Sequence, residues 1–378
     1  MKEEMLVICA AQMQQMQYRL SKIDFGDSDR NHLRDELCEM ADVLHSRGVK
    51  GIKNSERDKK KLFYEGLMKW MHFLITSNTT NVPTQMSYVL KKILYAWLGK
   101  GLDNLVVVFV EGDFSVTRFK KDPMGTSLFE ASTGIKFSKD PVFVRIPHYY
   151  QEDMLFNIAL FHELGHIVDE QLNLFYDVKE SVIKATSGDV NKRIIREYFP
   201  ILNVGRTFDE GVIDSYIKEY IADLFAAQYV GKYIIEYLDY LGEQTRIPDS
   251  KTHPHFDIRK KMVDDFINCE NSKTRNTSNF LLQYIMESFA GAGKGNLTIR
   301  WKLIQGDDLL NDRPVVLADL DDLFSLFKHA WDVVYGGVNA VETARNIQLN
   351  TMSHYSFYDS LNKCVLDSVT QFMDSNLN

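Results

Sequence analysis

His162 and His166 are the residues whose types and spacing point most directly to chemistry. Side chains four residues apart on an α-helix project from the same face, so two imidazoles at these positions converge on one point. Neutral imidazole is a common ligand of divalent metal ions, and of zinc in particular. Glu163, next to the first histidine, is then placed to take a proton from a water molecule held by that metal.

The surroundings of this motif favour a metal site over two unrelated histidines on a solvated helix. The eight residues before it, 154–161, are apolar almost all round, and Ile167 and Val168 follow it. A helix that is apolar on every side is a buried one. Imidazole and carboxyl groups inside such a helix cost free energy unless they are paired or bind metal, so the sequence predicts a buried zinc site.

Glu219 is the best candidate for a third ligand, because a catalytic zinc usually has three protein ligands and one open position. Glu219 and Asp223 are four residues apart and share a helical face, among apolar neighbours. Ala222 and Ala226 are small and would let this helix approach the histidine helix closely. Asp223 could then accept the outer N–H of a ligand histidine. Other acidic residues remain open as the third ligand: Asp169, Glu170, Glu210 and Asp214.

A third segment, Thr252-His-Pro-His-Phe-Asp-Ile-Arg259, contains Pro254 at a position that suits the first turn of a helix. We expect a loop to end at Thr252 or His253 and a helix to continue through Phe266. Taken alone, the segment predicts a helix start and nothing more.

Together, the motifs H-E-L-G-H, E-Y-I-A-D and H-P followed by Arg resemble those of the gluzincin metallopeptidases. The resemblance covers residues 151–268. It is closest to the group that includes the CAAX-processing and heat-shock-linked membrane proteases and the ImmA/IrrE-type cytoplasmic peptidases. The chain departs from that group in two ways, because it has no membrane helices and no evident helix-turn-helix partner domain.

The resemblance implies roles for seven residues. It implies zinc ligands at His162, His166 and Glu219, a general base at Glu163, and a supporting carboxylate at Asp223. His253 and Arg259 would support the cleft, by binding Asp223 or the substrate backbone. The donor that stabilises the oxyanion stays open among four side chains: His253, His255, Tyr220 and Arg259.

The pattern of apolar residues predicts an α+β fold that is mostly α. Helical periodicity is found near 3–21, 30–46, 57–76 and 84–98, and again from about 206 to the end. Between them, the β-branched or alternating runs 105–110, 115–119 and 141–146 predict a small mixed or mostly antiparallel sheet. We therefore expect three regions: a helical region 1–98, a zincin-like core 99–268 and a helical region 269–378.

Three further expectations concern the substrate cleft. Val142–Ile146 is predicted as an edge strand that could bind an extended peptide beside the metal. His148, Tyr149 and Tyr150 would lie at the rim of the cleft or simply pack within a loop. The polar segment 171–208 would form a lid over the cleft, or a surface helix with loops.

The amino-acid composition limits the kinds of binding partner to be expected. With 44 basic and 52 acidic residues, the net charge of −8 disfavours a general nucleic-acid binder. No apolar stretch is long enough to span a membrane, and the apolar run near the amino terminus is too short for a secretory signal. The four scattered cysteines predict reduced thiols, so we expect a cytoplasmic protein that acts on a protein or peptide substrate. The oligomeric state is not indicated.

The function expected from these residues is that of a zinc-dependent endopeptidase in which Glu163 activates the zinc-bound water. A non-catalytic interaction or regulatory protein with a structural zinc site is the alternative, although such a site has no need of Glu163. A metal-dependent hydrolase or deaminase of small molecules is a second alternative. The chain lacks the H-x-E and P-C-x-x-C motifs of the zinc deaminases.

Overall fold

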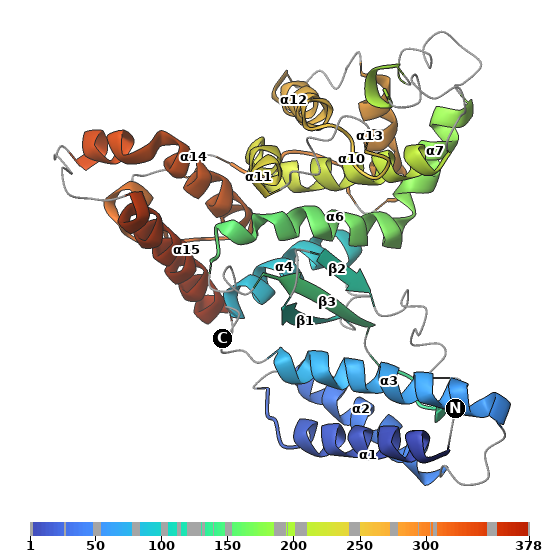
Figure 1. Ribbon diagram of the computed structural model, residues 1–378. Coiled ribbons are helices and arrows are strands. Elements are labelled where there is room, and N and C mark those ends of the chain that lie inside the picture. The colour runs from blue at the N-terminus through green and yellow to red at the C-terminus, as the bar shows by residue number, and fades with distance from the viewer. Residues whose placement is uncertain are drawn as a thin grey trace. The chain divides into compact units, whose positions relative to one another are not determined.

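The computed structural model shows a mostly helical chain, which confirms the mostly-α part of the predicted fold class (Figure 1). It divides into two compact units, Met1–Ser87 with Lys100–Glu152, and Tyr88–Gly99 with Asp153–Asn378. The structure describes residues 3–25, 28–47, 54–77, 84–99, 105–111, 115–118, 130, 133–138, 140–147, 153–184, 194, 196–200, 210–241, 250–272, 279–293, 295–302, 304, 308–345 and 354–376.

The first unit begins with three long helices, α1 (Glu3–Leu20), α2 (Ser28–Ser46) and α3 (Asn54–Thr76). They lie side by side in Figure 1 and bury one apolar face each. Their shared core includes Met13, Leu37 and Trp70. The helices therefore form for the reason that the sequence suggested, which is apolar residues repeating at three- and four-residue spacing.

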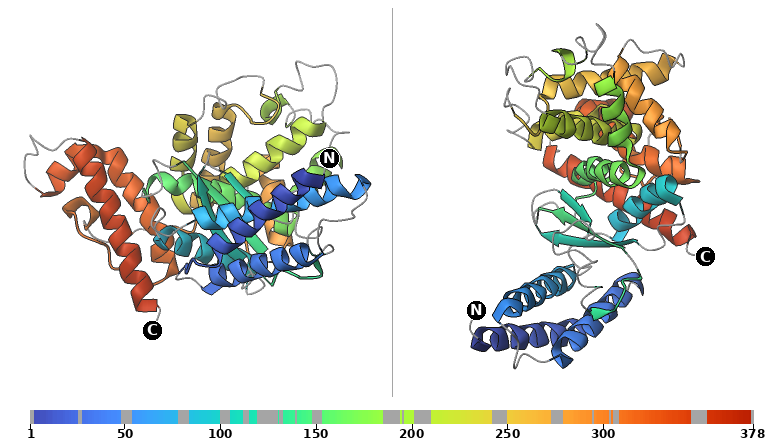
Figure 2. Two further views of the ribbon diagram at one scale, coloured as in Figure 1. Left: turned by 60° about the horizontal axis from the view of Figure 1, so that its bottom comes forward. Right: turned by 90° about the vertical axis from the view of Figure 1, so that its right-hand side faces the viewer.

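The same unit contains the strands β1 (Leu105–Glu111), β2 (Ser115–Arg118) and β3 (Asp140–Ile146) in the order β1-β3-β2. The strands lie side by side in Figure 2, with β3 parallel to β1 and antiparallel to β2. The prediction that Val142–Ile146 is an edge strand is wrong, because β3 pairs on both sides. The alternation of residues along a strand reports which face is buried and carries no information about which edge is free.

The second unit is built around α10 (Glu210–Val230), whose residues from Tyr216 to Val230 are almost all buried. It packs against α6 (Ala159–Leu172), α7 (Leu174–Lys184), α11 (Tyr233–Leu241), α12 (Phe256–Ser272) and α14 (Leu320–Arg345). The remaining helices of the unit are α4 (Thr84–Leu98), which enters it at Tyr88, the one-turn helices η4 (Phe156–Ile158) and η7 (Leu309–Asn311), α13 (Phe280–Gly291) and α15 (His354–Asn376).

A buried hydrogen bond ties α4 to α10. The indole N–H of Trp97 donates to the hydroxyl of Tyr229 at 2.8 Å, and both side chains are almost fully buried. The four cysteines are free, as expected. None of the described helices is long and apolar enough to cross a membrane.

Candidate metal centre

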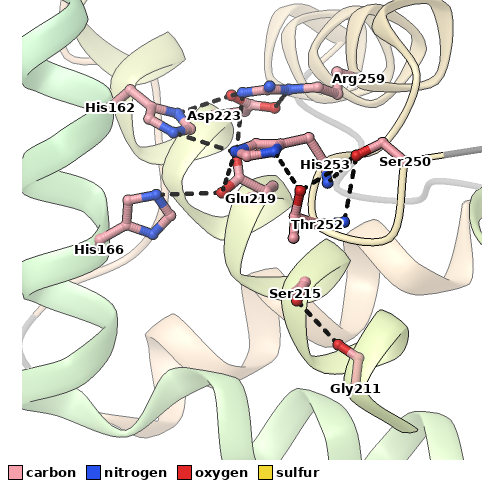
Figure 3. Close-up of polar contacts among 10 residues, drawn as sticks. All are labelled: His162, His166, Gly211, Ser215, Glu219, Asp223, Ser250, Thr252, His253 and Arg259. Carbon is pink, nitrogen blue, oxygen red and sulfur yellow. Dashed lines mark hydrogen bonds and ion pairs between the residues drawn. The ribbon is translucent and has the colours of Figure 1, made fainter. Parts of the chain in front are cut away.

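The structure brings His162, His166 and Glu219 together (Figure 3). The two histidines extend from α6 and the glutamate from α10, and one ligand atom from each lies within 4.8 Å of the others. Nε2 of His162 is 3.5 Å from Oε2 of Glu219, and Nε2 of His166 is 3.5 Å from Oε1. The group is largely buried, with His162 only 4% exposed.

This group fits a divalent metal ion. Zinc bonds of about 2.0–2.1 Å in a tetrahedron place neighbouring ligand atoms about 3.3 Å apart, close to the two separations found here. Two imidazoles and one carboxylate also match the donor set of zinc sites that leave a fourth position open. The three residues could therefore hold a metal ion.

A close approach of α6 to α10 makes this convergence possible. A Cβ atom added at Gly165 would lie 2.6 Å from Cα of Ala222 and 3.0 Å from its carbonyl oxygen. Contacts this short with backbone cannot be relieved by rotating a side chain. The pair Gly165–Ala222 thus sets the distance between the helix of the histidines and the helix of Glu219, as the small residues of α10 suggested.

Asp223 and Arg259 form a buried ion pair behind the ligands. Nε and a terminal nitrogen of Arg259 donate to the two carboxylate oxygens of Asp223 at 2.7 Å and 2.6 Å. The same carboxylate lies 2.9 Å from Nδ1 of His162, and it has no exposed surface. Asp223 therefore lies beside the outer ring nitrogen of His162, at the position predicted for it.

Burial and neighbouring charges set the protonation of the metal-free site. Burial lowers the pKa of the His162 imidazole, but the carboxylates of Asp223 and Glu219 outweigh it and raise the pKa to about 10. Burial lowers the pKa of His166 to about 4. Burial raises the pKa of Glu219, yet His162 and Arg259 hold it well below its usual range. The site thus holds one imidazolium, one neutral imidazole and one carboxylate near neutral pH.

His253 lies at the edge of the group, with Nε2 at 3.8 Å from Oε1 of Glu219 and a side chain that is 35% exposed. Two other candidates for an oxyanion donor are engaged elsewhere, because the hydroxyl of Tyr220 donates to the carbonyl of Tyr198 and the guanidinium of Arg259 donates to Asp223. Nδ1 of His255 accepts from the backbone N–H of Asp257, which leaves its Nε2 able to donate. Of the two histidines, His253 is the one with a described contact to Glu219.

Glu163 lies on α6 beside His162, with a partly exposed side chain. This is the environment that a proton acceptor needs, because it must be reached by a water molecule and a substrate.

The open alternatives for the third ligand do not join the group. Asp169 accepts a hydrogen bond from the backbone N–H of Phe175 at 2.6 Å, and Glu210 and Asp214 pair with Lys179. Across the residues that the structure describes, only His162, His166 and Glu219 gather in this way, so Glu170 does not either.

Some expectations fall outside the described residues. His148, Tyr149 and Tyr150 are among them, as is most of 185–209, where the predicted lid would extend. Within 171–208, the segment 174–184 forms α7.

Sequence reasoning missed several residues that shape the site. Gly165 was counted only as a spacer within the histidine motif, although a glycine inside an apolar helix is itself a signal of close packing. Tyr216, Ser250 and Thr252 were missed as well, since they act through hydrogen bonds of a loop that no spacing pattern reveals.

Searches of known protein families, curated proteins and solved structures found no match to this chain. The resemblance to gluzincins therefore rests on the sequence motifs alone.

Replacing Gly165 with alanine should disturb the site, because the new methyl group would lie 2.6 Å from the backbone of Ala222. We expect a loss of about 1–3 kcal/mol in the free energy of unfolding and a weaker affinity for zinc. Denaturant titration of the metal-free protein and zinc competition with a chelator measure the two effects. Gly291→Ala is the matched control, since its added Cβ meets nothing within 4 Å. Equal results for both variants would contradict the packing argument.

Zinc binding at pH 7.5 should release about one proton. A metal ligand must be a neutral imidazole, whereas the pKa of about 10 keeps His162 protonated in the metal-free protein. The part of the release that comes from His162 should disappear as the pH rises through 10, where this ring has already lost its proton. Calorimetry in buffers of different ionisation enthalpy counts the protons. Binding without proton release at pH 7.5 would show that His162 is neutral before metal arrives.

Proposed function

We propose that this protein is a zinc-dependent endopeptidase that hydrolyses a specific protein substrate in the cytoplasm. The observation that carries the proposal is the convergence of His162, His166 and Glu219, with Glu163 next to the first ligand. The order of the three motifs along the chain supports a zincin-like core of the gluzincin type around α6 and α10.

In this reaction each residue has a role that its surroundings permit. A bound zinc ion would supply a water molecule of lowered pKa and would polarise the scissile carbonyl. Glu163 takes the proton of the attacking water and delivers it to the leaving amine. His253 donates a hydrogen bond to the carbonyl oxygen as negative charge develops there.

The residues behind the ligands maintain their orientation. Asp223 holds the ring of His162 so that Nε2 faces the metal position. Arg259 balances the charge of Asp223 and also lies 3.4 Å from Oε2 of Glu219. Without this guanidinium, two carboxylates would be buried next to each other with no cation other than His162.

The rival proposal is an interaction protein in which the metal only stabilises the fold. Structural zinc sites usually have four protein ligands, whereas three of the residues that the structure describes form the group here. The partly exposed Glu163 beside His162 also has no purpose in a structural site.

Metal content is the first test. Protein purified without added metal should contain about one zinc per chain by mass spectrometry, and Glu219→Ala should lose it. Glu210→Ala is the matched control, because Glu210 lies on the same helix and pairs only with Lys179 among the described contacts. Protein that takes up no zinc even when supplied with it would refute the site.

Glu163→Gln should keep the fold and the metal yet lose activity by about 10²–10⁴-fold, because only the proton acceptor is removed. Cleavage of labelled casein and of a peptide library, with and without a chelator, measures the effect. Glu170→Gln, a second glutamate on α6, should leave cleavage unchanged. Full activity in Glu163→Gln would exclude Glu163 as the base, and cleavage unaffected by the chelator would exclude a metallopeptidase.

A further inference from the structure

The loop residues 250–253 form a chain of hydrogen bonds that ends on His253 (Figure 3). Oγ of Ser250 accepts from the backbone N–H groups of Thr252 and His253 at 3.3 Å and 3.1 Å. The same Oγ lies 3.3 Å from Oγ1 of Thr252, which in turn lies 2.9 Å from Nδ1 of His253. The ring of His253 thus has one nitrogen on Thr252 and the other toward Glu219.

A hydrogen bond connects this loop to α10, the helix that carries Glu219. The hydroxyl of Tyr216 donates to the carbonyl oxygen of Ser250 at 2.6 Å. Tyr216 is almost fully buried, stacks on Phe199 and precedes Glu219 by one helical turn. The position of His253 relative to Glu219 is therefore built into the fold.

The lone pairs of the Ser250 and Thr252 hydroxyls indicate which group donates in each hydrogen bond of this chain. A serine hydroxyl has two acceptor lone pairs and one donor hydrogen. Both acceptor positions of Ser250 are taken by backbone N–H groups, so its hydrogen points to Thr252. Thr252 then accepts from Ser250, and its own hydrogen can be donated to Nδ1 of His253, which lies 2.9 Å away.

We propose that Thr252 is a positioning residue, which holds neutral His253 in the tautomer with hydrogen on Nε2 and turns that N–H toward Glu219. A nitrogen that carries a hydrogen has no lone pair for a metal. His253 is consequently a hydrogen-bond donor at the open side of the site and is not a fourth ligand. The catalytic use of this donor rests on the proposed peptidase activity, whereas the tautomer does not.

The position of His253 agrees with a role as a hydrogen-bond donor and not as a metal ligand. Its Nε2 approaches Glu219 to 3.8 Å but does not belong to the set of ligand atoms that lie within 4.8 Å of one another. A donor that stabilises an oxygen in the fourth position has to lie farther from the metal than a ligand does.

Nuclear magnetic resonance of the full chain with isotope-labelled histidine tests the tautomer directly, at a pH where the ring is neutral. The signals of His253 are assigned by their loss in His253→Gln. We expect the Nε2–H form to dominate in the wild type and in Thr252→Ser, which keeps the hydroxyl. In Thr252→Val, which is nearly isosteric, the ratio of Nε2–H to Nδ1–H should fall at least about 5-fold. An unchanged ratio in Thr252→Val, or a dominant Nδ1–H form in the wild type, would overturn the proposal.

Zinc affinity separates a donor from a ligand. Competition titrations should give affinities within about 2-fold of wild type for Thr252→Val and His253→Gln, and a loss of at least about 100-fold for Glu219→Ala. A loss of more than 10-fold in His253→Gln would make His253 a ligand and refute the donor role.

Casein cleavage then tests the catalytic consequence. Thr252→Val should lower kcat about 10-fold at unchanged KM, and Thr252→Ser should restore it. Wild-type protein that binds zinc but never cleaves would count against the peptidase alone, because the tautomer and affinity measurements would still decide the role of Thr252.

Discussion

The direct contact between α6 and α10 at Gly165 and Ala222 is the constraint on which the candidate site depends. Both helices are largely buried, and Gly165 has no side chain to hold the backbone of Ala222 away. Only at this distance can imidazoles from one helix and a carboxylate from the other reach a common centre. Gly165 and Ala222 therefore determine both the packing of the two helices and the distance between the ligand side chains.

The candidate site also requires that the charges of its buried carboxylates be balanced by cations. Asp223 is inaccessible and Glu219 nearly so, and a buried carboxylate without a partner would cost several kcal/mol. Arg259 from α12 contacts both carboxylates, and His162 carries the second positive charge in the metal-free protein. Two cations then face two anions, so the pocket is electrically balanced before any metal binds. The third helix is as necessary to the site as the two that supply the ligands.

The sequence predicted those parts of the site that follow a local rule. Spacing of four residues identified the pairs His162–His166 and Glu219–Asp223, because a helix repeats on that scale. Helix positions followed from the apolar period for the same reason. The edge assignment of Val142–Ile146 failed because strand order depends on distant segments. The roles of Ser250, Thr252 and Tyr216 at the site were not predicted, since they arise from tertiary hydrogen bonds.

The attachment of so many groups to α10 limits how the site could be controlled. Glu219 and Asp223 belong to this helix, Arg259 joins it through an ion pair, and the loop of His253 is bound to it by Tyr216. These groups would move as one body if α10 moved. The two histidines on α6 are the exception, so a small slide between the two helices would separate the ligands and break the contact of His162 with Asp223, while the contacts of α10 with Arg259 and with the loop of His253 stayed in place. A regulator that works by conformational change would therefore act at the interface between α6 and α10.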